Sequence, residues 1–540
     1  MKIKIVLLCI ISVFKISDII SDCECSVPNL KYKGNRSIVK IRAADFNYNP
    51  VVGNAAYTIN QPGIYYLEDY VTASPEVDNL SLIYINSSNV KLNLNSLVIT
   101  QDSNHFTKNI NVVEIAPNVT DVNITNGVLQ NINGIGVKSN LNVSNLYVSN
   151  LVIDKLTNLG IYLNNVRNAV LSQFCVTNCN GSNPNSSDGA VSGKLQNCSN
   201  IRISNSYFNS NIANDLNTDS IGLLIDNCSS LKLENCSSVQ NQGKNAYGFV
   251  IRNNSSACTI NNCSVLGCQS NNGRAVGFLF DNSSSNSLLD CISESNQSVG
   301  GNCAGFSFDG QAGYYFSARL KNLNIINCTS KNNKALGASN DAFGFSGNLL
   351  DFAIFRSCKA ISNSSADGNV YGFYSGAGTN NYFESCSAQD NISGINTNSV
   401  VSGFALLNGE QNSSIKESIS VNNFSSSGES YGIRLGYNTD TNTHVNNIIY
   451  KNYIANNKGG SKQYGYRDFA SITTTNLIAN ISFGQGKINP SPISQLVLTN
   501  NMNYMFTLPS TKAPAYVVVE SSTGEVAEIK VKPFGNLSVY

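Results

Sequence analysis

A short phrase that begins with Gly and an apolar residue returns along this chain about every 28 residues. One copy reads YGFVIRNNSSACTINNCSVLG at residues 247–267, where short alternating runs are separated by Asn, Ser and Gly. Such runs and separators are typical of short strands and turns, and no window has the period of an amphipathic helix. Three short strands in a unit of fixed length predict turns that stack on one another.

The repeated Gly defines columns of equivalent residues, because stacked turns lie about 4.8 Å apart. It stands at Gly222, Gly248, Gly277, Gly305, Gly344, Gly372, Gly403, Gly432 and Gly465, with weaker copies at Gly134, Gly160 and Gly189. The next residue of each copy is expected to point into the core: Leu223, Phe249, Phe278, Phe306, Phe345, Phe373, Phe404, Ile433 and Tyr466. The residue after that is expected on the outer face, where Leu224, Val250 and Leu279 favour contact with a loop or a partner.

Cys residues form another column, made of Cys175, Cys236, Cys263, Cys291, Cys328, Cys358 and Cys386, with Ser206 and Ser418 in the same place in other turns. Buried thiols are the favoured interpretation, because Cys packs as a small apolar residue. Disulfide bonds between a few of these residues are an alternative interpretation, because the distance between successive turns matches the distance that a disulfide bridges. Metal ligands would have to converge, which a straight column does not do, so no metal site is expected. Cys23 and Cys25 lie outside the column and are the pair most favoured for oxidation. The abundant Asn is attributed to amide ladders and left-handed turns.

The composition excludes some functions and predicts a location. Charged residues make up 13% of the chain and the net charge is +1, which argues against a nucleic-acid partner. No cofactor is expected. Lys2 and Lys4 precede an apolar stretch of about ten residues, which predicts a signal peptide over residues 1–21 and a secreted or cell-surface protein. No other stretch is long and apolar enough to be expected to span a membrane.

Residues 59–99 read INQPGIYYLEDYVTASPEVDNLSLIYINSSNVKLNLNSLVI. This stretch resembles the first turns of right-handed parallel β-helix proteins of the pectate-lyase-like type, with Ser96 in place of a Gly. Together with the repeat, the resemblance implies an all-β fold: a single right-handed parallel β-helix of about 14 turns with three short strands each. The expected domains are a signal peptide at 1–21, an N-terminal segment or cap at 22–58, the β-helix at 59–485, and a tail with a β-hairpin cap at 486–540.

That fold carries many unrelated activities, so function has to be argued from sites. The fourth position after the repeated Gly forms an outer column of Asp226, Arg252, Asp281 and Asp309. Asp281 and Asp309 would lie one turn apart, near the carboxyl spacing of a retaining glycosidase, with Asp309 as proton donor. An insertion at 310–319 follows directly and offers aromatic faces for a sugar: Tyr314, Tyr315 and Phe316. The alternative is a surface ladder in which Arg252 screens both neighbouring acids.

Other motifs add little to a catalytic interpretation. Residues 217–220, NTDS, resemble a motif of polygalacturonase-like hydrolases, but the Asp-Asp, Gly-His-Gly and Arg-Ile-Lys motifs that accompany it are absent. His105 and His444 are interpreted as loop or surface residues. The leading hypothesis is therefore a secreted or surface-exposed, non-catalytic protein that binds a polysaccharide or other glycan, or acts in adhesion. A polysaccharide lyase or glycoside hydrolase is the first alternative, and a structural spike or fibre, which could form an oligomer, is the second.

Overall fold

The computed structural model of this chain describes most of the repeat region and several short strands beyond it. The described residues are 38–50, 54–181, 189–213, 217–309, 319–394, 396–436 and 446–468, with strands at 476–478, 481–483, 487–489, 504–505, 515–520 and 526–531. The chain divides into two compact units, Met1–Ile38 and Val39–Tyr540, and the repeat belongs to the second. The expected signal peptide, Cys23 and Cys25 lie outside the described residues.

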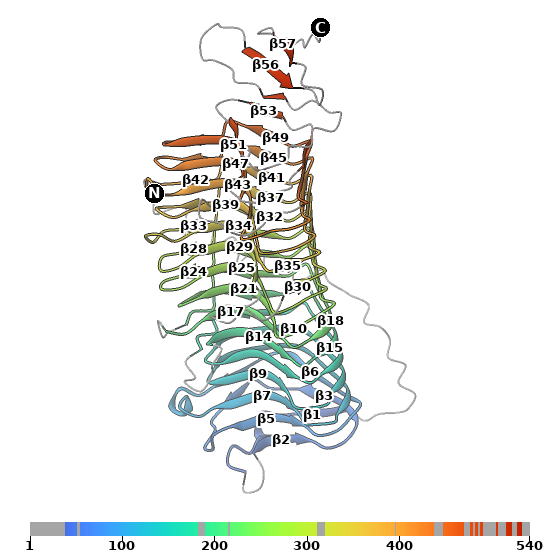
Figure 1. The fold of residues 1–540 in the computed structure, drawn as a ribbon. Helices are drawn as coiled ribbons and strands as arrows, with labels where there is room; N and C mark the ends of the chain where they lie inside the picture. Colours follow the sequence, from blue (N-terminus) through green and yellow to red (C-terminus); the bar gives the residue numbers. More distant parts are fainter. Residues whose placement is uncertain are drawn as a thin grey trace. The chain divides into compact units, whose positions relative to one another are not determined.

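The fold is all-β, a parallel β-solenoid of about 14 turns, which confirms the prediction from the repeat. One of its faces is a parallel sheet of 16 strands, which we call sheet B, and Figure 1 shows these strands stacked in chain order from β2 upward. The strands of sheet B are β2 (Ala55–Ile59), β5 (Leu80–Ile85), β7 (Ile110–Ile115), β9 (Gly134–Ser139), β11 (Leu159–Asn164), β14 (Ala190–Gln196), β17 (Ser220–Asp226), β21 (Ala246–Arg252), β25 (Ala275–Asp281), β29 (Cys303–Asp309), β34 (Ala342–Asn348), β39 (Val370–Gly376), β43 (Val400–Leu407), β47 (Glu429–Leu435), β51 (Lys462–Asp468) and β54 (Lys487–Asn489).

The largest sheet, sheet A, has 29 strands and consists of two parallel ladders. In the early turns, one long strand takes part in both ladders. In later turns, two shorter strands replace it, one in each ladder; β12 and β13, for example, both pair with β10. Its strands are β1 (Ile38–Ile41), β3 (Gly63–Leu67), β4 (Val71–Ala73), β6 (Val90–Gln101), β8 (Thr120–Ile132), β10 (Ser144–Leu156), β12 (Arg167–Ser172), β13 (Cys175–Thr177), β15 (Ser199–Ser204), β16 (Tyr207–Asn209), β18 (Ser229–Glu234), β19 (Ser237–Val239), β22 (Thr259–Asn261), β23 (Ser264–Leu266), β26 (Ser287–Leu289), β27 (Ile292–Glu294), β31 (Asn324–Ile326), β32 (Thr329–Lys331), β36 (Ile354–Arg356), β37 (Lys359–Ile361), β40 (Tyr382–Glu384), β41 (Ser387–Gln389), β44 (Ser414–Lys416), β45 (Ile419–Val421), β48 (Ile448–Tyr450), β49 (Tyr453–Ala455), β52 (Asn476–Ile478), β53 (Ile481–Phe483) and β55 (Tyr504–Met505).

Smaller pairings complete the fold. An eight-stranded parallel sheet contains β20 (Gln242–Gly243), β24 (Gln269–Ser270), β28 (Gln297–Ser298), β33 (Lys334–Ala335), β38 (Ser364–Ser365), β42 (Ile392–Ser393), β46 (Phe424–Ser425) and β50 (Lys458–Gly459). Strand β30 (Leu320–Lys321) pairs with β35 (Leu350–Asp351), and single 3-10 turns occur at Ala43–Asp45 and Ser103–His105. Strands β56 (Ala515–Glu520) and β57 (Val526–Val531) are antiparallel, as expected for the C-terminal hairpin. Its role as a cap and the right-handed sense of the solenoid stay predictions.

The residue that follows the repeated Gly lies in the core, as predicted. Phe278, Phe306 and Phe345 are at most 1% exposed. Their rings stack with centroids 4.9 and 4.7 Å apart and interplanar angles of 5° and 3°. The stack continues through Phe373 and Phe404 at centroid distances of 4.8 and 4.9 Å. Parallel strands in register therefore turn one repeated position into a continuous column of aromatic contacts.

A second run of buried rings, which was not predicted from the sequence, lies beside the first. Phe308 and Phe355 are 5.7 Å apart, and Phe355 stacks on Phe383 at 4.8 Å. Phe355 also meets Phe345 of the first stack edge to face, at 6.1 Å and 82°. The rings of this second run come from both sheet B and sheet A, so side chains of two sheets fill the interior.

The repeated Gly is required by the narrow interior. A Cβ atom on Gly277 would overlap Ser293 Oγ and lie 2.7 Å from the carbonyl oxygen of Gly305. Two of the weaker copies, Gly134 and Gly189, do not belong to this column: the register places Gly136 beside Gly160, and a Ser occupies the position in the next turn. Gly134 and Gly189 instead have φ of 145° and 77°, conformations that Gly adopts at little cost.

Asn side chains form the amide ladders that the sequence predicts. Nδ2 of Asn333 donates to Oδ1 of Asn363 at 2.8 Å, and Nδ2 of Asn363 donates to Oδ1 of Asn391 at 3.1 Å. All three side chains are fully buried. Other Asn residues occupy left-handed turns; Asn227, with φ of 52°, donates to Asn197 of the preceding turn at 2.7 Å. The Asn excess thus supplies both buried hydrogen bonds and turn conformations.

The 13 Cys residues that the structure describes are free thiols, and all except Cys175 are buried. The Cys column stands in register from Cys236 to Cys386, but Cys175 does not belong to it, because it pairs with Tyr207, one position away from Ser206 of the column. The thiol of Cys263 donates to the carbonyl oxygen of Asn261 at 3.3 Å. Burial raises the pKa of Cys175 and Cys258 to about 11. These features support the interpretation of the column as buried thiols.

Outside the core, the column of Leu224, Val250 and Leu279 packs into a separate apolar cluster, in which these residues are 0–5% exposed. The remaining members are Leu159, Val191, Ile221, Tyr247, Val276, Ala304, Phe343, Tyr371, Ala405 and Leu407. Alternation after the inward residue places Leu224, Val250 and Leu279 on the outer face of sheet B, opposite the phenylalanine stack. The residue before each repeated Gly, such as Tyr247 or Val276, packs in the same cluster, so the alternation is interrupted at the Gly. The outer face is therefore covered in these turns, in line with the expected contact.

Candidate functional site on the outer face of sheet B

The outer face of sheet B is polar in its first turns. One column runs from Thr58 through Tyr84 and Glu114 to Lys138, with each residue in register with the next. The same column continues into the later turns and reaches Leu224 of the apolar cluster. The first turns therefore present hydrogen-bonding and charged groups at positions where later turns present apolar side chains.

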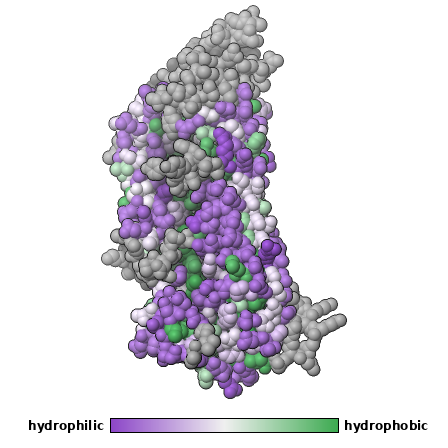
Figure 2. Space-filling model, turned by 60° about the horizontal axis from the view of Figure 1, so that its bottom comes forward, coloured by the Kyte–Doolittle hydropathy of each residue, from purple (hydrophilic) through white to green (hydrophobic). Residues whose placement is uncertain are grey.

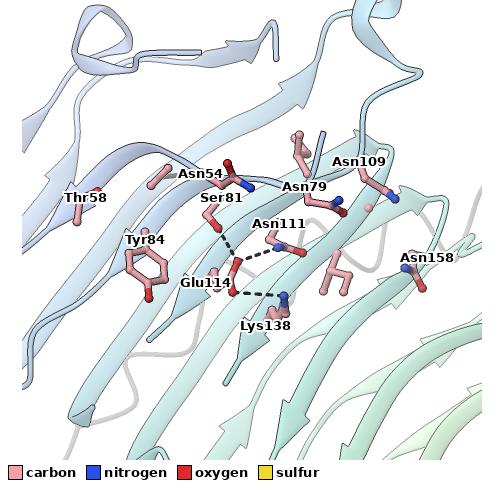
Figure 3. A pocket seen from close by; sticks show the side chains of 14 residues that line it. Asn54, Thr58, Asn79, Ser81, Tyr84, Asn109, Asn111, Glu114, Lys138 and Asn158 are labelled. Atoms are coloured by element: carbon pink, nitrogen blue, oxygen red, sulfur yellow. Dashed lines mark hydrogen bonds and ion pairs between the residues drawn. The ribbon is translucent and has the colours of Figure 1, made fainter. Parts of the chain in front are cut away.

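A hollow of about 600 Å³ lies on this polar part (Figure 3). It is lined by residues of β2, β5, β7 and β9 and by residues just ahead of sheet B strands. Five amide side chains contribute to its wall: Asn54, Asn79, Asn109, Asn111 and Asn158. Its volume is within the range of small-molecule sites, and its lining is unusually polar for such a site.

Glu114 is held by four side-chain donors. Oε2 accepts hydrogen bonds from Ser81 Oγ at 2.5 Å and from Asn111 Nδ2 at 2.8 Å. Oε1 accepts a hydrogen bond from Asn140 Nδ2 at 2.8 Å and pairs with Lys138 Nζ at 3.3 Å. Burial opposes ionisation, but the hydrogen bonds and the Lys138 charge outweigh it, so the pKa of Glu114 lies below its usual value. Glu114 is thus an ionised carboxylate with two partners on each oxygen, and it has no proton to donate.

Tyr84 gives the hollow an aromatic wall. Figure 3 shows its ring on one side of Glu114, with Asn109 and Asn158 on the other side. Burial, reinforced by the charge of Glu114, raises the pKa of Tyr84, so the phenol stays protonated. An aromatic face beside amides, which both donate and accept hydrogen bonds, suits a ligand with many hydroxyl groups.

The hollow was not predicted from the sequence, because the Gly-Phe phrase is absent from the first turns. A signal was present in two strands that align with each other, NLSLIYI at 79–85 and NINVVEI at 109–115. Ser81 and Asn111 occupy one shared position of this alignment, and Tyr84 and Glu114 occupy another. Aligning these two strands would have paired Ser81 with Asn111 and Tyr84 with Glu114, but regular alternation would have assigned the two pairs to opposite faces.

The outer column predicted from the repeat is present in the structure. Asp226, Arg252, Asp281 and Asp309 stand in register on successive turns. Arg252 Nη2 lies 2.9 Å from Asp226 Oδ2, an ion pair in which Asp226 is only 7% exposed. The surface-ladder alternative expects Arg252 to screen both neighbouring acids, and this pair is the part of it that involves Asp226.

Arg274, which the repeat pattern did not single out, pairs with Asp309. Its Nη2 lies 2.5 Å from Asp309 Oδ2 and donates to Ser307 Oγ at 3.0 Å. Burial raises the pKa of Asp281, the charge of Asp309 adds to the shift, and Arg252 opposes it. Asp281 Oδ1 is buried without a hydrogen-bond partner. The surroundings of Asp281 thus favour its protonated form, whereas Asp309, the acid expected to donate a proton, has a cation beside it.

The aromatic residues expected beside these acids, Tyr314, Tyr315 and Phe316, lie outside the described residues. Arg319, at the end of the expected insertion, pairs with Asp351 at 2.6 Å.

His105 does not belong to either of these two places. His105 Nδ1 lies 2.9 Å from Asp102 Oδ2 in a short loop, as expected, and His444 lies outside the described residues. Across the described ranges, no three His, Cys, Asp or Glu side chains are grouped so that they could hold a metal ion. In the same part of the chain, no helix has the length and apolar character needed to cross a membrane. Figure 2 shows a face on which hydrophilic residues dominate and hydrophobic ones form small separate patches.

Comparison with known proteins concerns the fold alone. No known protein family and no curated protein matches the chain. Among solved structures, ORF18 of Geobacillus virus E2 is 12% identical, with a TM-score of 0.31, and the match covers 67% of this chain and 62% of that one, less than two thirds of its length. A mutant tailspike protein of E. coli bacteriophage HK620 in complex with pentasaccharide is 13% identical over 72% of both chains, with a TM-score of 0.37. The A-module of mannuronan C-5 epimerase AlgE6 from Azotobacter vinelandii is 9% identical over 83% of this chain and 89% of that module, with a TM-score of 0.25.

Proposed function

We propose that this chain is a secreted or cell-surface protein that binds a carbohydrate, without cleaving it, in the hollow of β2, β5, β7 and β9. The observation that carries the proposal is the hollow itself, with its amide wall and Tyr84 around an ionised Glu114. Sugar hydroxyl groups both donate and accept hydrogen bonds, which side-chain amides match. The face of a tyrosine ring packs against the apolar face of a sugar ring.

The state of Glu114 favours binding over catalysis. A general acid must carry a proton near the working pH, and the pKa of Glu114 is shifted in the opposite direction. A nucleophile or base needs a free lone pair, and the oxygens of Glu114 already accept from Ser81, Asn111, Asn140 and Lys138. Glu114 therefore acts as a positioning residue that orients the donors around it.

Replacement of Tyr84 by Ala should weaken carbohydrate binding at least tenfold, because the ring supplies the apolar contact of the hollow. A glycan array of the wild-type protein identifies ligands, and calorimetric titration then compares wild type with Tyr84→Ala. The matched control is Tyr382→Ala in sheet A, since Tyr382 is 42% exposed and lies far along the chain from the hollow. Equal affinity in Tyr84→Ala and wild type would exclude the hollow as the binding site.

Hydrolysis or lyase chemistry at Asp281 and Asp309 is a second candidate function. The observation that favours it is Asp281, whose raised pKa and unpartnered oxygen are properties of a proton donor. Asp309, in register one turn away and paired with Arg274, would be the second carboxyl group of the site. Arg252, Asp226, Tyr314, Tyr315 and Phe316 stay proposed ligand contacts of that site. A structural spike or fibre, and any oligomer, also stay predictions.

If the second candidate holds, Asp281→Asn should abolish turnover, because an amide cannot donate the proton that the leaving group needs. The rate of the wild-type protein should fall as pH rises through the raised pKa of Asp281, since the protonated form is the active one. Release of reducing sugar from neutral polysaccharides and polyuronates measures this. Asp290→Asn, between β26 and β27, is the control, because Asp290 adopts φ of 54°, which Asn tolerates well. Absence of release by the wild-type protein would eliminate this candidate.

A further inference from the structure

We infer that the hollow selects an uncharged saccharide over the corresponding uronate, an inference that rests on the proposed carbohydrate binding. Glu114 and Lys138 are the only charged side chains among the residues that line the hollow, all of which the structure describes. They pair at 3.3 Å and compensate each other. No uncompensated positive charge of the lining therefore remains to balance a carboxylate on the ligand.

The rim of the hollow adds a further negative charge. Asp78 Oδ1 accepts a hydrogen bond at 2.7 Å from the backbone N–H of Asn109, a lining residue. Asp78 thus places a carboxylate beside the paired Glu114 and Lys138 of the lining. A ligand carboxylate would therefore be repelled as it enters, and the repulsion would be greatest at low ionic strength.

Lys138 does not remove the repulsion of a ligand carboxylate. Its ammonium group has donors beyond the one that faces Glu114, and a ligand carboxylate could approach them. That carboxylate would then share one cation with Glu114 at close range, and two such acids disfavour each other's ionised form. A hydroxyl group at the same place carries no charge, and it can donate to the amide oxygen of Asn111 or accept from the ammonium.

Saturation of Glu114 points to the same ligand class. Because its oxygens are occupied, the amides of Asn54, Asn79, Asn109 and Asn158 are the main acceptors left for ligand hydroxyl groups. An amide oxygen accepts readily from a hydroxyl group but repels a carboxylate oxygen. A sugar with a free primary alcohol can therefore use both the oxygen and the NH2 group of such an amide, whereas the carboxylate of its uronate can use only the NH2 group.

The test uses matched tetrasaccharides that differ only in oxidation at the primary alcohol: glucose against glucuronate, mannose against mannuronate, and galactose against galacturonate. In each pair of tetrasaccharides that the protein binds, we expect the affinity for the neutral member to be at least tenfold higher than the affinity for its uronate at low ionic strength. The ratio should narrow at high salt because screening weakens the repulsion.

Two variants should shift this ratio in opposite directions. Asp78→Asn keeps the oxygen that accepts from Asn109 and removes the rim charge, so the preference for the neutral sugar should narrow severalfold. Lys138→Met leaves Glu114 uncompensated, so the preference should widen severalfold. The measured quantity is the ratio of the two affinities within one variant, which cancels general losses of binding.

The outcomes separate the two proposals. A uronate that binds as tightly as its neutral partner, with affinity that Tyr84→Ala removes, overturns the selectivity and leaves carbohydrate binding in place. Binding of neutral sugars that Tyr84→Ala does not change places the ligand elsewhere and overturns the proposed function of the hollow. Absence of binding to all six tetrasaccharides and to a wider glycan array overturns both.

Discussion

Replacing Phe306 by Ala should lower the free energy of unfolding by about 3–5 kcal/mol. The ring is fully buried and lies between Phe278 and Phe345, with centroid distances of 4.9 and 4.7 Å. Backbone ladders on both sides of β29 fix the neighbouring strands in register, so the gap cannot close by sliding one turn toward the other. Most of the removed volume therefore stays as a cavity, which adds to the lost transfer free energy.

Denaturant unfolding and hydrogen exchange measure this effect together. Long repeat arrays unfold in more than one step, so exchange of the amides in β25, β29 and β34 reports the local change directly. Phe424→Ala is the matched control, because the same side chain in β46 is 41% exposed and its loss should change stability by less than about 0.5 kcal/mol. Equal protection in Phe306→Ala and wild type would contradict the aromatic stack as a source of stability.

The columns of the solenoid could be predicted because the turns stack, so a residue that recurs in every repeat occupies the equivalent position in every turn. Phe306 and Leu279 each stand at a fixed distance from a Gly, and that distance gives their register and face. The early turns carry no such marker. Gly134 and Gly189 were assigned wrongly for this reason: a Gly in a left-handed or extended turn looks the same in sequence as one required by close packing.

The candidate site was harder to predict from the sequence, because it depends on contacts between turns whose residues differ. Ser81 donates to Glu114 across 33 positions of sequence, and neither residue belongs to a motif. Arg274 reaches Asp309 in the next turn through the conformation of a long side chain, which the sequence does not encode. Because the sequence does not show Arg274 beside Asp309, it favoured Asp309 as the proton donor; the roles of the two carboxyl groups stay predictions.

The column predicted from the sequence, around Asp281, and the hollow found in the structure, around Glu114, lie on one continuous face. The outer face of sheet B begins with the hollow around Glu114, continues into the apolar cluster around Leu224, and carries the Asp281 column beside that cluster. Because the backbone register is unbroken, only side-chain identity distinguishes these regions. A regular scaffold can therefore present a binding hollow in some turns and a covered surface in others without a change of fold.

Gly277→Ala should lower the free energy of unfolding by about 2–3 kcal/mol, because a Cβ atom there has no space to occupy. It would overlap Ser293 Oγ of β27 and lie 2.7 Å from the carbonyl oxygen of Gly305 in β29, and that carbonyl is fixed in the ladder of sheet B. Chemical denaturation compares this variant with Gly267→Ala, whose Cβ would have its nearest neighbour at 3.8 Å but whose φ is 70°. The control should lose about 1 kcal/mol from backbone strain alone. Adding Ser293→Ala to Gly277→Ala should recover part of the loss, since it removes one of the two overlapping atoms. A smaller loss in Gly277→Ala than in Gly267→Ala would mean that backbone preference, and not interior space, selects the repeated Gly.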